Sequence, residues 1–192
     1  LPMEVNGKLY NVAAAFSHAC VKAFIPKRCL PNYAELYEMR HFAEGNKEAL
    51  FVDFAGQMVP FGGDILLQSD AIEGLCVGCE ICEDLWTPDP PSTALALAGA
   101  TVIVNLSASN ETVGKAEYRR NLVSMTSSRL LCAYIHASAA EGESTQDLVF
   151  SGHNMIAENG RILAQTKRFE AGTAIADIDI KRINTERRRM TT

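Results

Sequence analysis

The stretch CVGCEICEDLW, residues 76–86, holds three of the six cysteines of this chain and spaces them three residues apart. Two interpretations compete: the cysteines hold a metal ion, or a strand delivers one reactive thiol. The apolar run at residues 75–82 favours a strand, along which side chains alternate between two faces. Cys76 and Cys82 would then face one way and Cys79 the other, so the three thiols could not close around one ion. With no fourth cysteine at a ligand spacing, the sequence argues against a metal site.

Cys82 differs from its neighbours because it ends the apolar run and directly precedes the polar sequence EDLW. A thiol at the carboxyl end of a strand, on a sharp turn, occupies the nucleophile position of many α/β enzymes. Such a turn exposes the sulfur and leaves the next backbone N–H free to bind an oxyanion. The competing interpretation is a buried strand cysteine that serves as a small apolar residue. We predict that Cys82 is accessible at a strand end, whereas Cys79 lies on the opposite side of its strand.

The composition indicates a single compact domain rather than a nucleic-acid-binding or membrane protein. The chain has 192 residues, of which 47% are apolar and 21% charged, and its formal net charge is −5. This balance offers no basic face for nucleic acid. The longest nearly apolar run, residues 94–104, is too short to cross a bilayer. No segment resembles a signal peptide, so we expect a cytoplasmic protein whose cysteines stay reduced.

Hydrophobic periodicity predicts strands that alternate with two helices. The helices are expected at residues 90–100 and 115–131, and Asn-Gly pairs at residues 6–7 and 159–160 predict hairpin turns. Strands are expected at residues 8–16, 20–25, 49–54, 64–69, 75–82, 101–106, 132–137, 147–152, 154–166 and 174–180. A Gly-rich turn at residues 62–63 would join two of these strands. The pattern is typical of a mixed α/β sandwich.

Four blocks of sequence stand in an order that is characteristic of one enzyme family. They read FIPKRCLPNYAELYEMRHFAEG, GCEICEDLW, ATVIVNLSASN and GESTQDLVFSGHNMIAENG. On these blocks the chain resembles the nitrilase-type, or carbon–nitrogen hydrolase, glutaminase domain of glutamine-dependent NAD synthetases. The resemblance runs over residues 6–190. It implies an α/β fold, the nitrilase-like α-β-β-α sandwich.

The family uses a Cys–Glu–Lys triad, and two of its members have counterparts here. Cys82 in EICEDLW resembles the nucleophile, which attacks the side-chain amide of glutamine and forms a γ-glutamyl thioester. Lys27 in PKRCLPNY resembles the triad lysine, and we expect it near Cys82. Glu38 in LYEMR resembles a second, supporting carboxylate near the lysine.

The resemblance also implies residues that bind the amino-acid end of glutamine. Tyr33, Glu83 and Ser109 fall where the family holds the α-ammonium and α-carboxylate groups. The alternative for each is an ordinary role in a loop or helix start. The four histidines have no ligand spacing, so we expect no metal site among them. The resemblance implies no cofactor for this domain.

The triad glutamate is the departure from the family. It lies upstream of the lysine in the family, whereas the only acidic residue before Lys27 here is Glu4, which does not match the motif. We therefore expect an incomplete sandwich that lacks its first strand–helix units, with impaired activity. Residues 1–180 would form the hydrolase domain fragment, and residues 181–192 would begin a linker toward an absent synthetase domain. ATP and magnesium would belong to that domain, since no nucleotide-binding loop is found here.

Three functions compete at this stage. The first is a glutaminase that supplies ammonia for NAD synthesis and assembles as a homo-oligomer with its synthetase domain. The second is an amidase of the same superfamily that acts on another small amide. The third is an inactive module that only packs against partners. Tyr33, Glu83 and Ser109 together favour glutamine, because a free amino acid needs partners for both of its charges.

Overall fold

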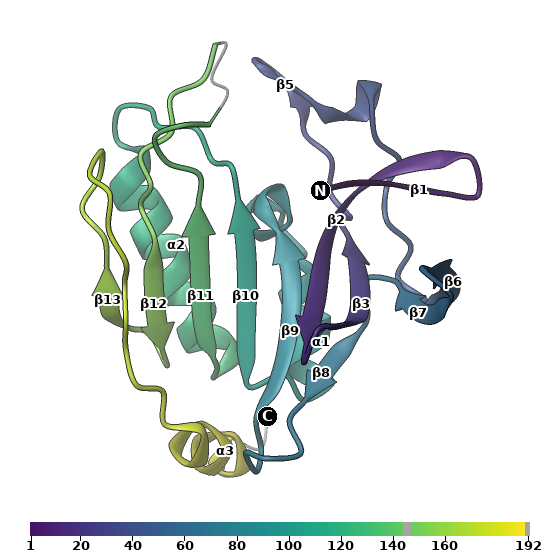
Figure 1. The fold of residues 1–192 in the computed structure, drawn as a ribbon. Coiled ribbons are helices and arrows are strands. Elements are labelled where there is room, and N and C mark those ends of the chain that lie inside the picture. The colour runs from purple at the N-terminus through teal and green to yellow at the C-terminus, as the bar shows by residue number, and fades with distance from the viewer. Residues whose placement is uncertain (144–146, 191–192) are drawn as a thin grey trace.

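The computed structural model describes residues 1–143 and 147–190, which form two packed β-sheets, with the helices at residues 91–97 and 115–130 on the outer side of the larger one (Figure 1). The larger sheet has the order β13-β12-β11-β10-β9-β8, and the smaller has the order β1-β2-β3-β7-β6. This layered α/β arrangement confirms the expected fold class. Among the described residues, no helix has the length and apolar character needed to cross a bilayer.

The strands of the larger sheet are β8 (Leu66–Gln68), β9 (Cys76–Ile81), β10 (Val102–Ser107), β11 (Ala133–Ser138), β12 (Met155–Glu158) and β13 (Arg161–Gln165). Those of the smaller sheet are β1 (Pro2–Val5), β2 (Lys8–Ser17), β3 (Cys20–Pro26), β6 (Leu50–Phe54) and β7 (Gln57–Phe61). A short hairpin consists of β4 (Asn32–Tyr33) and β5 (Leu36–Tyr37). The helices are α1 (Pro91–Leu97), α2 (Lys115–Leu130) and α3 (Ile180–Arg189), with 3-10 turns η1 (Glu38–Arg40) and η2 (Cys82–Trp86).

The centre of the larger sheet is parallel, and this positions the candidate site. Strands β9, β10 and β11 run in one direction, whereas β8 and β12 pair antiparallel at its sides. The carboxyl ends of the three parallel strands therefore meet at one edge, which is the upper edge in Figure 1. Ligands of open α/β sheets commonly bind at that edge. The segment after each of these strands is therefore a candidate to line a pocket.

The two faces of the larger sheet pack against different elements. Ile103 and Tyr134 point toward α1 and α2 and pack in one buried cluster with Leu95 and Val123. On the opposite face, core residues of β9 contact those of the smaller sheet in a second cluster. The buried members of this intersheet cluster are Ala13, Ala23, Ile25, Cys79 and Ile81. Burial between the layers thus explains the near-continuous apolar sequence of β9.

Most of the predicted elements are present, including the helix at Lys115–Leu130 and the hairpin turn at Asn6-Gly7. The turn at residues 62–63 leads from β7 to β8 rather than from the strand at residues 50–54, because β7 intervenes and pairs antiparallel with β6. Sequence reasoning missed β7 because Pro60 lies within it and two glycines follow Phe61 directly.

Two predicted strands are wrong. In residues 147–152, Phe150 alone makes a bridge, to Asn110. Residues 174–179 form no strand, and Ile180 begins α3, whose N-cap carboxylate is that of Asp179. The alternating apolar residues there serve packing instead, since Ile178 and Ile180 contact the face of the larger sheet around Ile183. The domain boundary expected at residue 180 stays a prediction.

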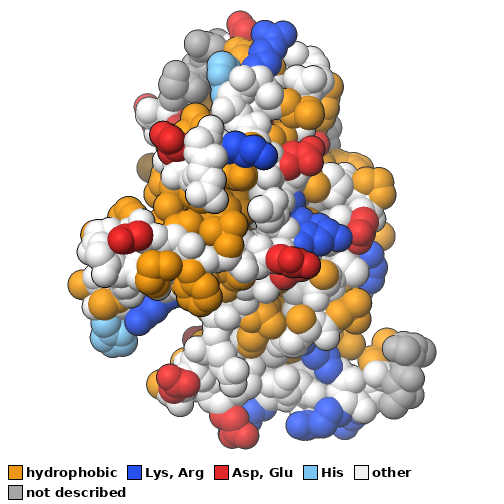
Figure 2. Space-filling view, turned by 90° about the vertical axis from the view of Figure 1, so that its right-hand side faces the viewer, with side chains coloured by type: hydrophobic (Ala, Val, Ile, Leu, Met, Phe, Trp, Pro, Cys, Tyr) orange, Lys and Arg blue, Asp and Glu red, His pale blue; other side chains and the backbone are white. Residues whose placement is uncertain are grey.

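The smaller sheet exposes several large apolar side chains on β2, β6 and β7. Phe16 is 76% exposed, and Phe51, Phe54 and Met58 are also exposed. Figure 2 looks onto the right-hand side of Figure 1 and shows hydrophobic side chains gathered across the middle of that face. Contiguous apolar surface of this kind favours association.

We expect the chain to self-associate at high concentration, in agreement with the homo-oligomer expected from the sequence. Sedimentation velocity should show a weight-average sedimentation coefficient that rises with protein concentration. The double substitution Phe51→Thr with Met58→Thr should lower it, because it removes apolar surface from the exposed face. Leu97→Thr, which changes a still more exposed residue on α1, should not lower it. A chain that stays monomeric at every concentration would contradict this expectation.

Candidate active site

A pocket of about 590 Å³ opens at the carboxyl edge of the parallel strands. Its walls come from the turn after β9, the segment after β10, the end of β3 and the β4–β5 hairpin. The six residues predicted from the sequence, which are Lys27, Tyr33, Glu38, Cys82, Glu83 and Ser109, all line this pocket. Their convergence from distant parts of the chain makes it the candidate active site.

Cys82 lies at a sharp turn where β9 passes into η2. Ile81 is extended, with φ −126°, whereas Cys82 has φ 48° in the left-handed region. A non-glycine residue rarely adopts this conformation, and such strain is often found at functional sites. The thiol is partly buried and interacts with the Ser107 hydroxyl and the backbone N–H of Ala108.

The prediction that Cys82 and Cys79 face opposite ways is wrong. Cys79 is a buried member of the intersheet cluster, and Cys82 packs against the edge of that same cluster. Alternation fails because the strand ends at Ile81 and the positive φ turns Cys82 out of the strand geometry. Among residues 1–143 and 147–190, no group of three metal-ligating side chains could hold a metal ion.

Lys27 follows the last residue of β3 and is only 1% exposed. Its ammonium group lies 2.5 Å from the Glu38 carboxylate. A buried ammonium is costly unless a negative group pairs with it, so this contact explains how Lys27 is accommodated. Burial raises the pKa of the Cys82 thiol, and the Lys27 ammonium acts against that rise. The lysine therefore favours the thiolate form.

Asp84 ties the cysteine turn to the lysine segment, and the sequence analysis did not single it out. Its carboxylate accepts hydrogen bonds from the backbone N–H groups of Ile81, at 2.8 Å, and Cys29, at 2.7 Å. A longer bond of 3.2 Å comes from the N–H of Arg28. Burial raises the pKa of Asp84, and these N–H donors oppose the rise. The sequence offered one signal of this role, a second acidic residue directly after Glu83.

The pocket also carries hydroxyl and charged groups that the sequence predicted as substrate contacts. The Tyr33 hydroxyl donates a hydrogen bond of 2.9 Å to Glu83. Burial and the Glu83 carboxylate raise the pKa of Tyr33, so it remains a donor. Ser109 is buried, and its hydroxyl has no hydrogen-bond partner within the described residues. This hydroxyl is therefore available to a ligand.

Lys115 is a pocket residue whose role sequence reasoning missed. It begins α2, and its ammonium group lies 5.1 Å from the ring centroid of Trp86. Trp86 is in turn stacked on Tyr118. Burial lowers the pKa of Lys115, and Arg119 lowers it further. A cation in the first turn of a helix opposes the helix dipole, and this unfavourable placement was a signal of function in the sequence.

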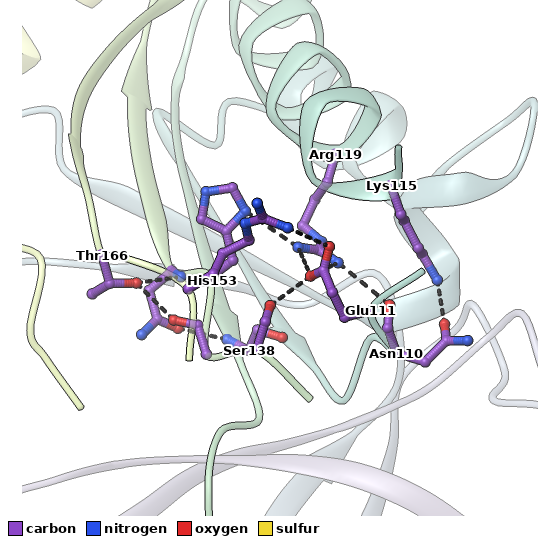
Figure 3. A network of polar contacts seen from close by, with 11 residues as sticks. Asn110, Glu111, Lys115, Arg119, Ser138, His153 and Thr166 are labelled. Carbon is purple, nitrogen blue, oxygen red and sulfur yellow. Dashed lines mark hydrogen bonds and ion pairs between the residues drawn. The ribbon is translucent and has the colours of Figure 1, made fainter. Parts of the chain in front are cut away.

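A buried ion-pair network fixes the segment between β10 and α2 (Figure 3). Arg119 is fully buried, and its guanidinium donates to the Glu111 carboxylate at 3.0 and 3.1 Å. The Ser151 hydroxyl also donates to Glu111, at 2.6 Å. Although burial acts to raise the pKa of Glu111, these donors hold it below its ordinary value. The network anchors the segment at residues 107–111, of which residues 107–110 line the pocket.

Residues 4–188 match the carbon–nitrogen hydrolase family. The glutamine-dependent NAD(+) synthetase of Mycobacterium tuberculosis is 44% identical over 193 residues, which cover all of this chain and 28% of that protein. The human glutamine-dependent NAD(+) synthetase is 32% identical and is matched over 93% of this chain and 27% of its own length. The chain thus spans little more than a quarter of the curated relatives that it matches.

Solved structures show the same fold. A glutamine-dependent NAD(+) synthetase from Cytophaga hutchinsonii superposes with a TM-score of 0.77 at 29% identity, over 88% of this chain and 27% of that chain. A carbon–nitrogen hydrolase from Helicobacter pylori superposes with a TM-score of 0.78 at 18% identity, over 97% of this chain and 62% of that one.

The charges around Cys82 predict opposite shifts for two substitutions. Iodoacetamide should alkylate Cys82 with a pH midpoint above the ordinary thiol range, because burial raises the pKa of this thiol. Lys27→Met should move the midpoint higher, whereas Glu38→Gln should move it lower, because the Glu38 carboxylate disfavours the thiolate. Mass spectrometry of the Cys82 peptide reports the rate, with exposed Cys20 as an internal reference. Two shifts in the same direction would refute this electrostatic description.

The hydrogen bonds of Asp84 predict a loss of stability in Asp84→Asn. The amide group would turn a donor toward a backbone N–H, which leaves buried donors unpaired at a cost of about 1–3 kcal/mol. Denaturant unfolding should show this loss. Asp64→Asn is a matched control, because Asp64 is exposed and forms a surface ion pair with Arg28. Equal stability of the two variants would contradict the proposed link between the cysteine turn and the lysine segment.

Proposed function

Because the chain belongs to the carbon–nitrogen hydrolase family, we propose that it is the glutamine-hydrolysing part of a glutamine-dependent NAD synthetase. One observation carries the proposal. A single pocket holds a strained cysteine beside a buried lysine, together with groups suited to a free amino acid. The similarity to glutamine-dependent NAD synthetases over the whole chain supports the same conclusion.

Cys82 is the proposed nucleophile. Its thiolate attacks the side-chain amide carbon of glutamine, and the carbonyl oxygen becomes an oxyanion. The Lys27 ammonium and the backbone N–H of Glu83 would stabilise that oxyanion. The C–N bond then breaks, and the nitrogen leaves as ammonia after taking a proton. The γ-glutamyl thioester that remains is attacked by water, which releases glutamate and restores the thiol.

Glu38 is proposed to hold Lys27 rather than to act as the general base. Its carboxylate is already engaged by the ammonium group at 2.5 Å, which leaves it poorly placed to take the thiol proton. Glu4, which precedes Lys27, is exposed on β1 and does not line the pocket. We therefore propose that the family's upstream glutamate has no counterpart in these residues and that the chain alone is impaired.

Other groups of the pocket suit the zwitterionic end of glutamine. Glu83, oriented by Tyr33, would bind the α-ammonium group. The free hydroxyl of Ser109 and the ammonium of Lys115 would bind the α-carboxylate. A simple aliphatic amide uses none of these groups, so they favour glutamine over other small amides.

We further propose that the ammonia serves a synthetase region of the full protein, which would amidate deamido-NAD with ATP and magnesium. The hydrolase part needs no cofactor in this scheme, because the nucleophile and the groups that stabilise the oxyanion are its own side chains and backbone. Homo-oligomerisation and a cytoplasmic location remain part of the proposal.

The proposed roles predict labelling without efficient turnover. A diazoketone analogue of glutamine should label Cys82 once and slowly, because the lysine still favours the thiolate. Glutamine hydrolysis by the chain should be barely above background, since general-base help contributes about 10²–10⁴-fold. A longer protein that carries the upstream glutamate should hydrolyse glutamine, and Cys82→Ala in it should abolish activity.

Ammonia release and mass spectrometry check both statements. Hydrolysis by the 192-residue chain at an ordinary enzymatic rate would show that a carboxylate within it is the base. Preference of the longer protein for a simple aliphatic amide would favour a different amidase. Failure of both proteins to react at Cys82 would favour an inactive packing module.

A further inference from the structure

Asn110 lies between a carboxylate and an ammonium group at the rim of the pocket. Its side-chain amide donates a hydrogen bond to Glu35, and its side-chain carbonyl accepts one from Lys115. Figure 3 shows Lys115 reaching from the start of α2 to Asn110. Asn110 is itself buried, so both contacts are made in a partly desolvated environment.

The carboxylate partner, Glu35, belongs to a short hairpin that is held at two points. Glu35 lies in the turn of the β4–β5 hairpin, residues 32–37, hereafter the flap. Tyr33 fastens the flap to Glu83 at 2.9 Å, and Glu35 fastens it to Asn110. Asn110 therefore connects the flap to the segment that also carries Ser109.

The backbone of Asn110 is held independently of its side chain. Its carbonyl accepts a hydrogen bond of 3.4 Å from Arg119, and the residue forms a bridge with Phe150. With the backbone fixed, the two charged neighbours determine how the amide is oriented. Its N–H₂ group must face the carboxylate and its oxygen must face the ammonium group.

The side-chain amide of Asn110 accepts a hydrogen bond from the Lys115 ammonium group without forming an ion pair with it. A carboxylate at this position would form an ion pair with Lys115 and would compete with an incoming carboxylate for the same ammonium group. It would also repel Glu35 and weaken the fastening of the flap. Asparagine avoids both effects and leaves the Lys115 ammonium without a carboxylate partner at this position.

We propose that Asn110 is a positioning residue that holds the Lys115 ammonium for the α-carboxylate of the substrate and couples that position to the closed flap. The pocket would thereby select amides that carry an amino-acid end. This inference rests on the proposed glutamine-hydrolysing function, because it assigns the determinant of substrate selection in the same pocket.

Two alkylating probes separate this role from a structural one. The diazoketone analogue of glutamine carries the amino-acid end, whereas iodoacetamide does not. In Asn110→Asp, the labelling rate of Cys82 by the diazoketone should fall about tenfold to hundredfold, the usual worth of hydrogen bonds to charged groups. The loss should appear as weaker saturable binding, with little change in the limiting rate. Labelling by iodoacetamide should stay within about twofold.

Matched variants test the two contacts separately. Asn121→Asp introduces the same charge on an exposed position of α2 and should behave like the unaltered chain. Glu35→Ala should lose part of the diazoketone rate, because it releases the flap, and Glu35→Gln should retain most of it, because the amide oxygen still accepts from Asn110. Glu35 is only partly buried, so these variants decide the question even if Asn110→Asp does not fold.

The outcomes are distinct from failure of the proposed function. If the diazoketone does not label Cys82 of the unaltered chain, the glutamine site itself is wrong. If it labels that chain but the Asn110 and Glu35 variants react equally well, the positioning role of Asn110 is wrong. An equal loss of rate with both probes would reduce Asn110 to a structural residue and would also overturn the proposal.

Discussion

The buried charge of Lys27 is the constraint on which the rest of the site depends. An ammonium group that is almost completely removed from water needs negative or polar partners in a fixed arrangement. Glu38 supplies the direct ion pair. Asp84 is close enough for Lys27 to lower its pKa, and its N–H donors join the lysine segment to the cysteine turn. Three local structures that are separate in sequence are thus held around one cation.

That constraint also accounts for the environment of Cys82. Burial alone would keep the thiol protonated and unreactive. Lys27 acts against this effect, as do the N–H of Ala108 and the hydroxyl of Ser107. The strained turn places the sulfur where these groups converge. The chemistry therefore follows from the packing of two sheets, because neither sheet alone brings the lysine to the thiol.

Much of this could be predicted from the sequence, and the exceptions have physical causes. The six predicted site residues lie in one pocket because each stands at a strand end or in a motif with fixed spacing. Asp84 and Asn110 were missed because their importance lies in contacts with residues 55 and 75 positions away. No local pattern encodes such contacts. The predicted orientation of the Cys82 side chain was wrong for a related reason, because side chains alternate between faces only while the strand continues.

The strand predictions failed where apolar alternation was present but a partner strand was not. Residues 174–179 alternate as a strand would, yet Ile178 uses its side chain to pack on the sheet face. Periodicity reports which side chains are buried, whereas a strand also requires an edge with free hydrogen-bonding groups. Nothing in a single sequence reveals whether that edge is available.

The segment at residues 107–111 contacts two functional parts of the pocket. Ser107 and Ala108 contact the thiol, and Asn110 accepts a hydrogen bond from Lys115. Glu111 then anchors the segment to the fully buried Arg119. Because one short segment contacts both groups, the positions of the thiol and of the Lys115 ammonium depend on its backbone and on the anchor that holds it. A buried ion pair of this kind contributes little net stability. The Glu111–Arg119 pair therefore matters chiefly because it fixes this segment, and a reaction within the pocket requires its groups to be held in fixed positions.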